Sequence, residues 1–265
     1  MRRDSVGGTI LVAAVLCVVC SVIVSVAAVG LRSFKEKNAL LDKQRSVLAA
    51  AGLLDPKDSG KQVTEKFNNV EKQIVNLETG EVATPEELKE AGILDPATYD
   101  PKTARDNPNL NRAVEDFPGF QTTEKYTNVY LIKKDGKLET LVLPIYGKGL
   151  WSTMEGFLAL ESDLVTAKGI TFYSHGETPG LGGEVDNPTW KAQWPGKKLR
   201  DEQGDVLIEV KKAGGASADS QSQVDGLSGA TITTNGVNNF VRFWLSNEGF
   251  GTYLEHLQSK EKSDG

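Results

Sequence analysis

The chain begins with one long apolar stretch and continues as short apolar runs separated by polar turns. No charged residue occurs between positions 5 and 31, and residues 9–31 form a largely apolar run of 23 residues. About 20 such residues are enough for a helix to cross the hydrocarbon core of a bilayer. A cleaved signal peptide is the alternative, but its apolar region is only about 7–15 residues long. The length therefore predicts an uncleaved transmembrane anchor at residues 9–31.

A helical pattern follows the anchor, and a turn-rich stretch follows that helix. Six apolar residues recur at roughly helical spacing in residues 34–54, which predicts a helix that Gly52 and Pro56 end. These six are Leu40, Leu41, Val47, Leu48, Ala51 and Leu54. Residues 55–118 are polar and rich in turn residues. They predict short helices and loops packed on a core.

The C-terminal half has the alternation and the turns of a sheet. Two β-rich runs surround Asp135-Gly136, a pair typical of tight hairpins, and predict a hairpin that turns at residues 134–137. Residues 156–175 predict further strand with a turn near Gly169. Residues 205–211 predict one more strand.

The most regular helical pattern lies near the C-terminus. Its apolar residues are spaced i, i+3, i+4, i+7 and i+8, which predicts a helix with one face in the core. We expect Thr233, Thr234 or Asn235 to cap its N-terminus, and Gly249 and Gly251 to mark its end. The apolar residues are Val237, Phe240, Val241, Trp244 and Leu245.

Composition narrows the possible functions. The 265 residues include 30 Lys+Arg and 36 Asp+Glu, a net charge of −6, whereas a nucleic-acid-binding face needs an excess of basic residues. We therefore expect no nucleic-acid partner. Both cysteines, Cys17 and Cys20, lie in the apolar stretch, so we expect no disulfide, metal site or thiol nucleophile in the rest of the chain. Basic residues flank both ends of the apolar stretch, and they do not decide its orientation.

Three glycine-rich motifs are the candidates for chemistry. Residues 225–234, DGLSGATITT, place small residues and hydroxyls at the start of the predicted last helix. Unpaired N–H groups and the helix dipole favour an anion there. The same residue types are also typical of a hydroxyl-rich capping loop, so both interpretations stay open.

The other two motifs lie at predicted strand ends. In residues 174–183, SHGETPGLGG, Pro179-Gly180 predicts a type II turn. His175 and Glu177 are either an acid–base pair or two ordinary loop residues. In residues 146–152, YGKGLWS, Trp151 either stacks on a planar ligand or packs on the core.

Together these motifs resemble the FMN-binding domain family of membrane electron-transfer complexes. The attachment motif of that family reads Asp-x-x-Ser/Thr-Gly-Ala-Thr-x-Ser/Thr, and residues 225–233 match it. The family's Glu-Thr-Pro-Gly-Leu-Gly loop stands at residues 177–182, and its Tyr-Gly-x-Gly-Leu-Trp segment at residues 146–151. The sequence at residues 50–53 and 243–251 favours the branch in Na+-translocating NADH:quinone reductases over the branch in ion-translocating ferredoxin:NAD oxidoreductases.

The resemblance implies an α+β fold, in which a single transmembrane helix precedes an antiparallel sheet with helices around it. The expected parts are a membrane anchor at residues 1–31 and a helical, loop-rich region at residues 32–120. An FMN-binding domain is expected at residues 121–258 and a polar tail at residues 259–265.

The resemblance also implies FMN joined by a phosphodiester to the hydroxyl of Thr231. A Mg2+-dependent flavin transferase would make this bond, taking FMN from FAD. The phosphate is expected at the N-terminus of the last helix, with the ring against residues 177–182. No residue is expected to act as a catalytic acid or base, and none to bind a metal. The other expected cofactor-binding residues are Asp225, Ser228, Gly229, Ala230, Thr233, Glu177, Thr178, Gly180, Leu181, Gly182 and Trp151.

The implied function is a flavoprotein subunit that relays electrons within a Na+-translocating NADH:quinone reductase. Its partners would be the other membrane subunits, and its FMN domain would face the periplasm from a bacterial inner membrane. The equivalent FMN protein of a ferredoxin:NAD oxidoreductase is one alternative. A membrane-anchored ligand-binding or sensor module is another, and so is a hydrolase using Ser228 or Thr231 with His175.

Overall fold

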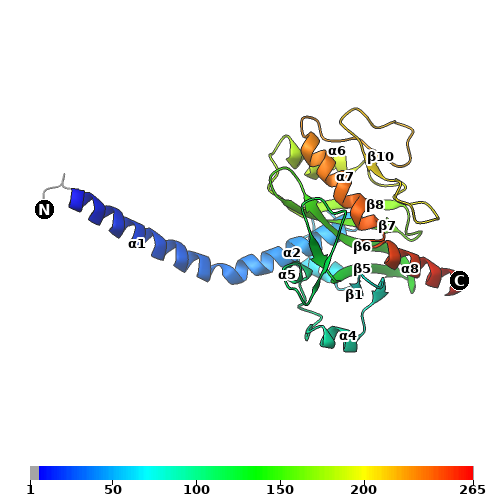
Figure 1. Ribbon diagram of the computed structural model, residues 1–265, viewed down its shortest axis with the longest axis horizontal. Helices are drawn as coiled ribbons and strands as arrows, with labels where there is room; N and C mark the ends of the chain where they lie inside the picture. Colours follow the sequence, from blue (N-terminus) through cyan, green and yellow to red (C-terminus); the bar gives the residue numbers. More distant parts are fainter. Residues whose placement is uncertain (1–5, 265) are drawn as a thin grey trace. The chain divides into compact units, whose positions relative to one another are not determined.

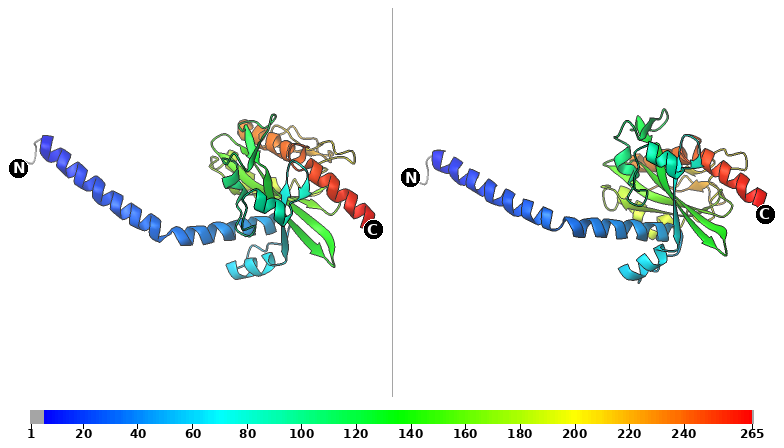
Figure 2. Two further views of the ribbon diagram at one scale, coloured as in Figure 1. Left: turned by 60° about the horizontal axis from the view of Figure 1, so that its bottom comes forward. Right: turned by 90° about the horizontal axis from the view of Figure 1, so that it is seen from below.

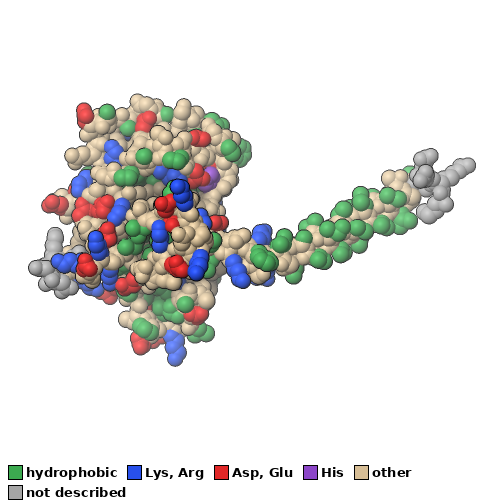
Figure 3. All heavy atoms as spheres, turned by 180° about the vertical axis from the view of Figure 1, so that it is seen from behind, with side chains coloured by type: hydrophobic (Ala, Val, Ile, Leu, Met, Phe, Trp, Pro, Cys, Tyr) green, Lys and Arg blue, Asp and Glu red, His purple; other side chains and the backbone are tan. Residues whose placement is uncertain are grey.

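The computed structural model describes residues 6–264 of the chain, which divides into two compact units, residues 1–43 and residues 44–265. Helix α1 (Val6–Gly30) lies in the first unit, and apolar side chains cover it (Figure 3). Its 25 residues would extend about 37 Å at 1.5 Å each, more than the thickness of a bilayer core of about 30 Å. The helix is therefore long and apolar enough to cross a membrane, as predicted.

The second unit is built on one antiparallel sheet of six strands (Figure 1). The strand order is β2-β1-β5-β6-β7-β8. Asp135 and Gly136, with φ of 52° and 79°, form the turn between β5 and β6 and confirm the predicted hairpin. The strands are β1 (Val70–Asn76), β2 (Glu81–Val82), β5 (Tyr126–Lys134), β6 (Lys137–Lys148), β7 (Thr153–Glu161) and β8 (Ala167–Ser174).

Both faces of this sheet are covered, so its central strands are buried almost throughout. Helix α7 (Thr231–Leu245) packs on one face together with the other helices and loops of the C-terminal half (Figure 2). The five apolar residues predicted for its core face are each at most 1% exposed. On the opposite face, Val47, Ala50 and Ala51 pack with residues such as Tyr130 and Phe157.

Two glycines allow these close approaches. A Cβ on Gly147 of β6 would lie 2.3 Å from Phe240 of α7. A Cβ on Gly169 of β8 would lie 2.5 Å from the carbonyl oxygen of Ala50. Gly169 therefore lies inside a strand and not at the predicted turn, because a helix end packs directly on it. The chain turns at residues 162–166 instead, where Leu164 has a φ of 59°.

Smaller elements surround the sheet. The helices are α3 (Gly60–Phe67), α4 (Pro85–Glu90), α5 (Pro101–Ala104), α6 (Pro188–Lys191), α8 (Gly251–Asp264) and the 3-10 turn η1 (Gly182–Asp186). The short strands are β3 (Asn111–Ala113), β4 (Thr122–Glu124), β9 (Glu209–Val210) and β10 (Gln223–Val224).

The structure corrects three more predictions about the elements of the fold. The segment predicted as helices and loops contains β1, which pairs with β5 inside the main sheet. Helix α2 (Arg32–Ala50) stops four residues before the predicted bound at residue 54, and Gly52, with a φ of 72°, follows its end as predicted. Leu40 on its predicted apolar stripe is 59% exposed. The strand predicted at residues 205–211 is only the two-residue β9. Residues 259–264, within the stretch expected as a polar tail, continue α8.

Candidate FMN site

The three glycine-rich motifs meet at the N-terminus of α7. One of them follows β6, another follows β8, and the last leads into the helix. Their common point is the carboxylate of Glu177, which is 5% exposed. Segments that lie far apart in the sequence are thus assembled around one buried acidic group.

The Glu177 carboxylate accepts four hydrogen bonds. The backbone N–H groups of Leu150, Trp151 and Ser152 donate to it at 3.1, 2.9 and 3.2 Å. The hydroxyl of Thr233 donates the fourth, at 2.7 Å. Burial by itself would raise the pKa of Glu177, but the bonds from Thr233 and the loop N–H groups outweigh it and hold the pKa below its ordinary value. The group is therefore an ionised carboxylate at neutral pH, directed inward.

The hydroxyls near the helix start have different roles. The N-cap of α7 is Ala230, and no side chain caps the helix, so the predicted capping by Thr233, Thr234 or Asn235 is wrong. Thr233 is only 1% exposed, and its hydroxyl donates to the Glu177 carboxylate. Thr234 is equally buried, and its hydroxyl accepts from the N–H of Leu227 at 3.0 Å. Both hydroxyls brace the loops against the helix instead of capping it.

Thr231 is the first residue of α7, and its side chain is exposed. Ser228 and Gly229 are exposed as well, whereas Ala230 is 7% exposed. The first intrahelical bond runs from the N–H of Thr234 to the oxygen of Ala230. The N–H groups of residues 231–233 precede that bond and point out of the helix end, where an anion is favourable.

Large apolar side chains are exposed in the same three motifs. Leu150 is 47% exposed, Trp151 70%, Leu181 44% and Ile232 58%. Trp151 therefore does not pack on the core, and its side chain is accessible to a ligand. Leu150 and Ile232 were not predicted as site residues. The signal for Ile232 was an isolated apolar residue inside a run of hydroxyls.

The loop at residues 177–182 has the predicted turn. The N–H of Leu181 bonds the oxygen of Thr178 at 3.1 Å, and Gly180 has a φ of 76°. Gly182 lies against the hydrogen bond between Thr233 and Glu177, since a Cβ there would be 2.6 Å from the Thr233 hydroxyl oxygen. Gly149 lies close to the same carboxylate, since a Cβ there would be 2.5 Å from Oε1 of Glu177. These two glycines allow the backbone to close around the carboxylate.

Asp225 supports the site from the loop that precedes it. Its carboxylate accepts from the N–H groups of Gly214, Gly215 and Ala216 at 2.9, 3.0 and 3.2 Å. The bond from Gly214 contributes most to holding the pKa of Asp225 below its ordinary value. Asp225 thus orders residues 214–216, and its carboxylate is directed toward that loop.

His175 and Glu177 do not form an acid–base pair. The Nδ1 of His175 accepts from the backbone N–H of Glu177 at 3.2 Å, and its Nε2 contacts Oδ2 of Asp186 at 2.8 Å. Both ring nitrogens are therefore occupied within this loop. That arrangement removes the base that the hydrolase interpretation assigned to Ser228 or Thr231.

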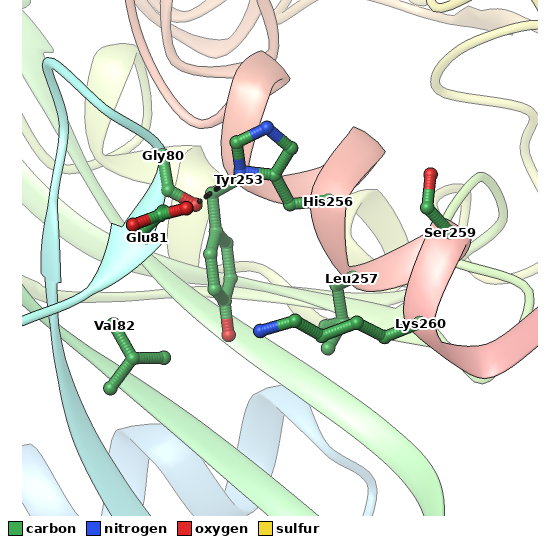
Figure 4. A pocket seen from close by; sticks show the side chains of 8 residues that line it. All are labelled: Gly80, Glu81, Val82, Tyr253, His256, Leu257, Ser259 and Lys260. Carbon is green, nitrogen blue, oxygen red and sulfur yellow. Dashed lines mark hydrogen bonds between the residues drawn. The ribbon is translucent and has the colours of Figure 1, made fainter. Parts of the chain in front are cut away.

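A separate pocket of about 270 Å3 lies between β2 and α8 (Figure 4). Gly80, Tyr253 and His256 are among the residues that line it. No residue of the three motifs lines this pocket, so it is distinct from the site at α7. A smaller hollow of about 230 Å3 does adjoin the motifs, with Gly149 and Ile232 in its wall.

Comparison with known proteins agrees with this geometry. The FMN-binding domain family matches residues 149–246, which contain nearly all of the candidate site. The NqrC protein of the Na+-translocating NADH-quinone reductase of Pseudomonas aeruginosa is 48% identical, over 98% of this chain and 99% of its own length. The chain belongs to the NqrC family of Na+-translocating NADH-quinone reductases. Another member, from Yersinia pestis, is 44% identical over 100% of this chain and 97% of its own.

Solved structures of NqrC proteins share the fold. The crystal structure of the Shewanella oneidensis protein has a TM-score of 0.72 and 34% identity, and covers 85% of this chain and 99% of its own. The Parabacteroides distasonis protein has a TM-score of 0.61 and 27% identity, with 86% and 96% covered. The expected α+β fold, an antiparallel sheet with helices after an apolar N-terminal helix, is confirmed.

Proposed function

We propose that this chain carries FMN in phosphodiester linkage to the hydroxyl of Thr231 and relays electrons within a Na+-translocating NADH:quinone reductase. When bound, FMN supplies the redox chemistry, since it accepts and donates electrons that side chains cannot. The chain's own residues bind the group and orient it.

The difference in exposure among the hydroxyls at the start of α7 supports this proposal. Thr233 and Thr234 are buried and bonded to Glu177 and Leu227, so an enzyme has no access to them. Thr231 is exposed at the helix N-terminus, beside the small residues Gly229 and Ala230. A threonine hydroxyl is a weak nucleophile without activation, which accounts for the need for a separate flavin transferase.

The residues present fit the two ends of FMN. The N–H groups of residues 231–233 at the start of α7 would hold the phosphate, because they and the helix dipole favour negative charge. The exposed side chains of Trp151, Leu181 and Ile232 would cover a flat aromatic ring. Ser228 and the turn at Thr178–Leu181 supply polar groups at the edge of this surface.

Helix α1 would anchor the protein in the inner membrane beside the other subunits, with the FMN domain on the periplasmic side. The apolar length of α1 supports the anchoring. A covalent bond has a physical advantage outside the cytoplasm, because a dissociated flavin could not be replaced there by mass action.

Peptide mass mapping of the native protein tests the linkage. We expect the peptide containing Thr231 to be heavier by FMN less one water, and the denatured protein band to fluoresce. Thr231→Val should abolish both signals, because it replaces the hydroxyl by a methyl group of similar size. Thr189→Val, the matched control at an exposed threonine in α6 outside the three motifs, should retain the linkage. A fluorescent, mass-shifted Thr231→Val protein would overturn the assignment.

A further inference from the structure

We propose that Glu177 is a positioning residue for the flavin, which acts by holding the Trp151 loop against the N-terminus of α7. The inference rests on the proposed function, because it concerns the FMN carried by Thr231. It assigns Glu177 no contact with the cofactor, in contrast to its expected place among the cofactor-binding residues.

The first step concerns the loop after β6. Residues 150–152 are exposed or half-buried and have little packing of their own. All three of their backbone N–H groups point to the Glu177 carboxylate. A second tie runs from the N–H of Gly176 to Oγ of Ser152, at 2.7 Å. The three hydrogen bonds from this loop to Glu177 therefore mainly set the direction of the exposed Trp151 side chain.

The second step concerns the helix. Thr233 lies two residues after Thr231 on α7, and its hydroxyl donates to Oε2 of Glu177, the same oxygen that accepts from Leu150. One carboxylate thus fixes the Trp151 loop relative to the residue that would carry the flavin. The Trp151 indole would then be held in a fixed position relative to a flavin on Thr231.

The third step is chemical. Four donors surround the carboxylate, and a carboxylate is an acceptor only. In Glu177→Gln the amide keeps the size of the side chain, but one of its ends becomes a donor that faces other donors. We therefore expect the loop to loosen without a change in core volume. Thr233→Val removes one of the four donors and leaves the charge in place, so its effect should have the same direction and be smaller.

Flavin fluorescence tests the proposal in the full-length protein after flavinylation. Indole stacked on a flavin quenches its emission, so a displaced Trp151 should make the bound flavin brighter. We expect the emission per bound FMN to rise in Glu177→Gln and to rise less in Thr233→Val. Glu184→Gln is the matched control, because Glu184 lies in the same segment and bonds only Asn187 among the described side chains. It should leave the emission unchanged.

The decisive comparison repeats Glu177→Gln in a Trp151→Leu background. If Glu177 acts through Trp151, the second substitution adds no further brightness, a non-additivity that a double-mutant cycle measures. Equal brightening in both backgrounds, or none in either, would overturn the proposal. Thermal unfolding of each variant shows whether it is folded, and if Glu177→Gln is not, the Thr233→Val cycle decides. Failure of the proposed function is seen separately, as the absence of FMN from Thr231 in the unsubstituted protein.

Discussion

Two carboxylates order the loops near the α7 N-terminus, and they do so differently. Glu177 is almost fully buried and joins three segments that are far apart in the sequence. Asp225 is half-buried and gathers N–H groups that lie only 9–11 residues before it. The first group assembles the site from distant parts, whereas the second orders one local loop. Loss of Glu177 should therefore disturb the whole site, and loss of Asp225 mainly one loop.

The largest expected effect comes from deleting the carboxylates. Glu177→Ala leaves the buried Thr233 hydroxyl and three backbone N–H groups without their acceptor, so we expect the free energy of unfolding to fall by about 3 kcal/mol. In Asp225→Ala water can reach the released N–H groups, and the loss should be about 1 kcal/mol. Urea unfolding of the two variants measures the difference. Equal losses would mean that Glu177 holds no more of the structure than Asp225 does.

Alanine substitution of one glycine beside each carboxylate sharpens the comparison. In Gly182→Ala the new methyl group would lie 2.6 Å from the Thr233 hydroxyl oxygen, so we expect a cost of about 2 kcal/mol and a poorer flavin site. Gly214, on the Asp225 side, has a φ of 74° and open space around it. Gly214→Ala should cost only about 1 kcal/mol, from backbone strain alone. Thermal unfolding and the extent of flavinylation measure both, and a flavinylation defect in Gly214→Ala alone would reverse the ranking.

The smallest effect is a dependence on pH. The pKa values of Glu177 and Asp225 lie below their ordinary values of 4.5 and 3.8. The stabilisation is therefore complete above those ordinary values and is lost as the pH falls through the lowered ones. The melting temperature should fall between about pH 5 and more acidic conditions, and fall less steeply in Glu177→Gln. An unchanged slope in that variant would show that Glu177 contributes no such stabilisation.

Local features of the fold could be predicted from the sequence, and distant pairings could not. Asp135-Gly136 and the apolar stripe of α7 are encoded within a few residues, and both predictions are confirmed. Strand β1 mixes polar and apolar residues, and its partner β5 begins about fifty residues after β1 ends, so no local pattern indicates it. The end of α2 on Gly169 depends on the same kind of distant packing.

The site shows the same division. The three motifs were recognisable in the sequence, and the structure brings them together. The direction of each side chain was not recognisable, because it depends on tertiary partners. Thr233 and Thr234 have the residue type of helix caps, yet their hydroxyls bond Glu177 and Leu227.

The place of β1 in the sheet has a consequence for how the chain is made. During synthesis β1 leaves the ribosome well before β5, so until β5 emerges its only sheet partner is the two-residue strand β2. A shortened protein that starts at residue 121 would keep β5 to β8 but present the bare backbone edge of β5 to solvent. Such an edge invites other chains to pair with it. A soluble piece for flavinylation assays should therefore keep β1, and it should also keep residues 44–51, which cover one face of the sheet.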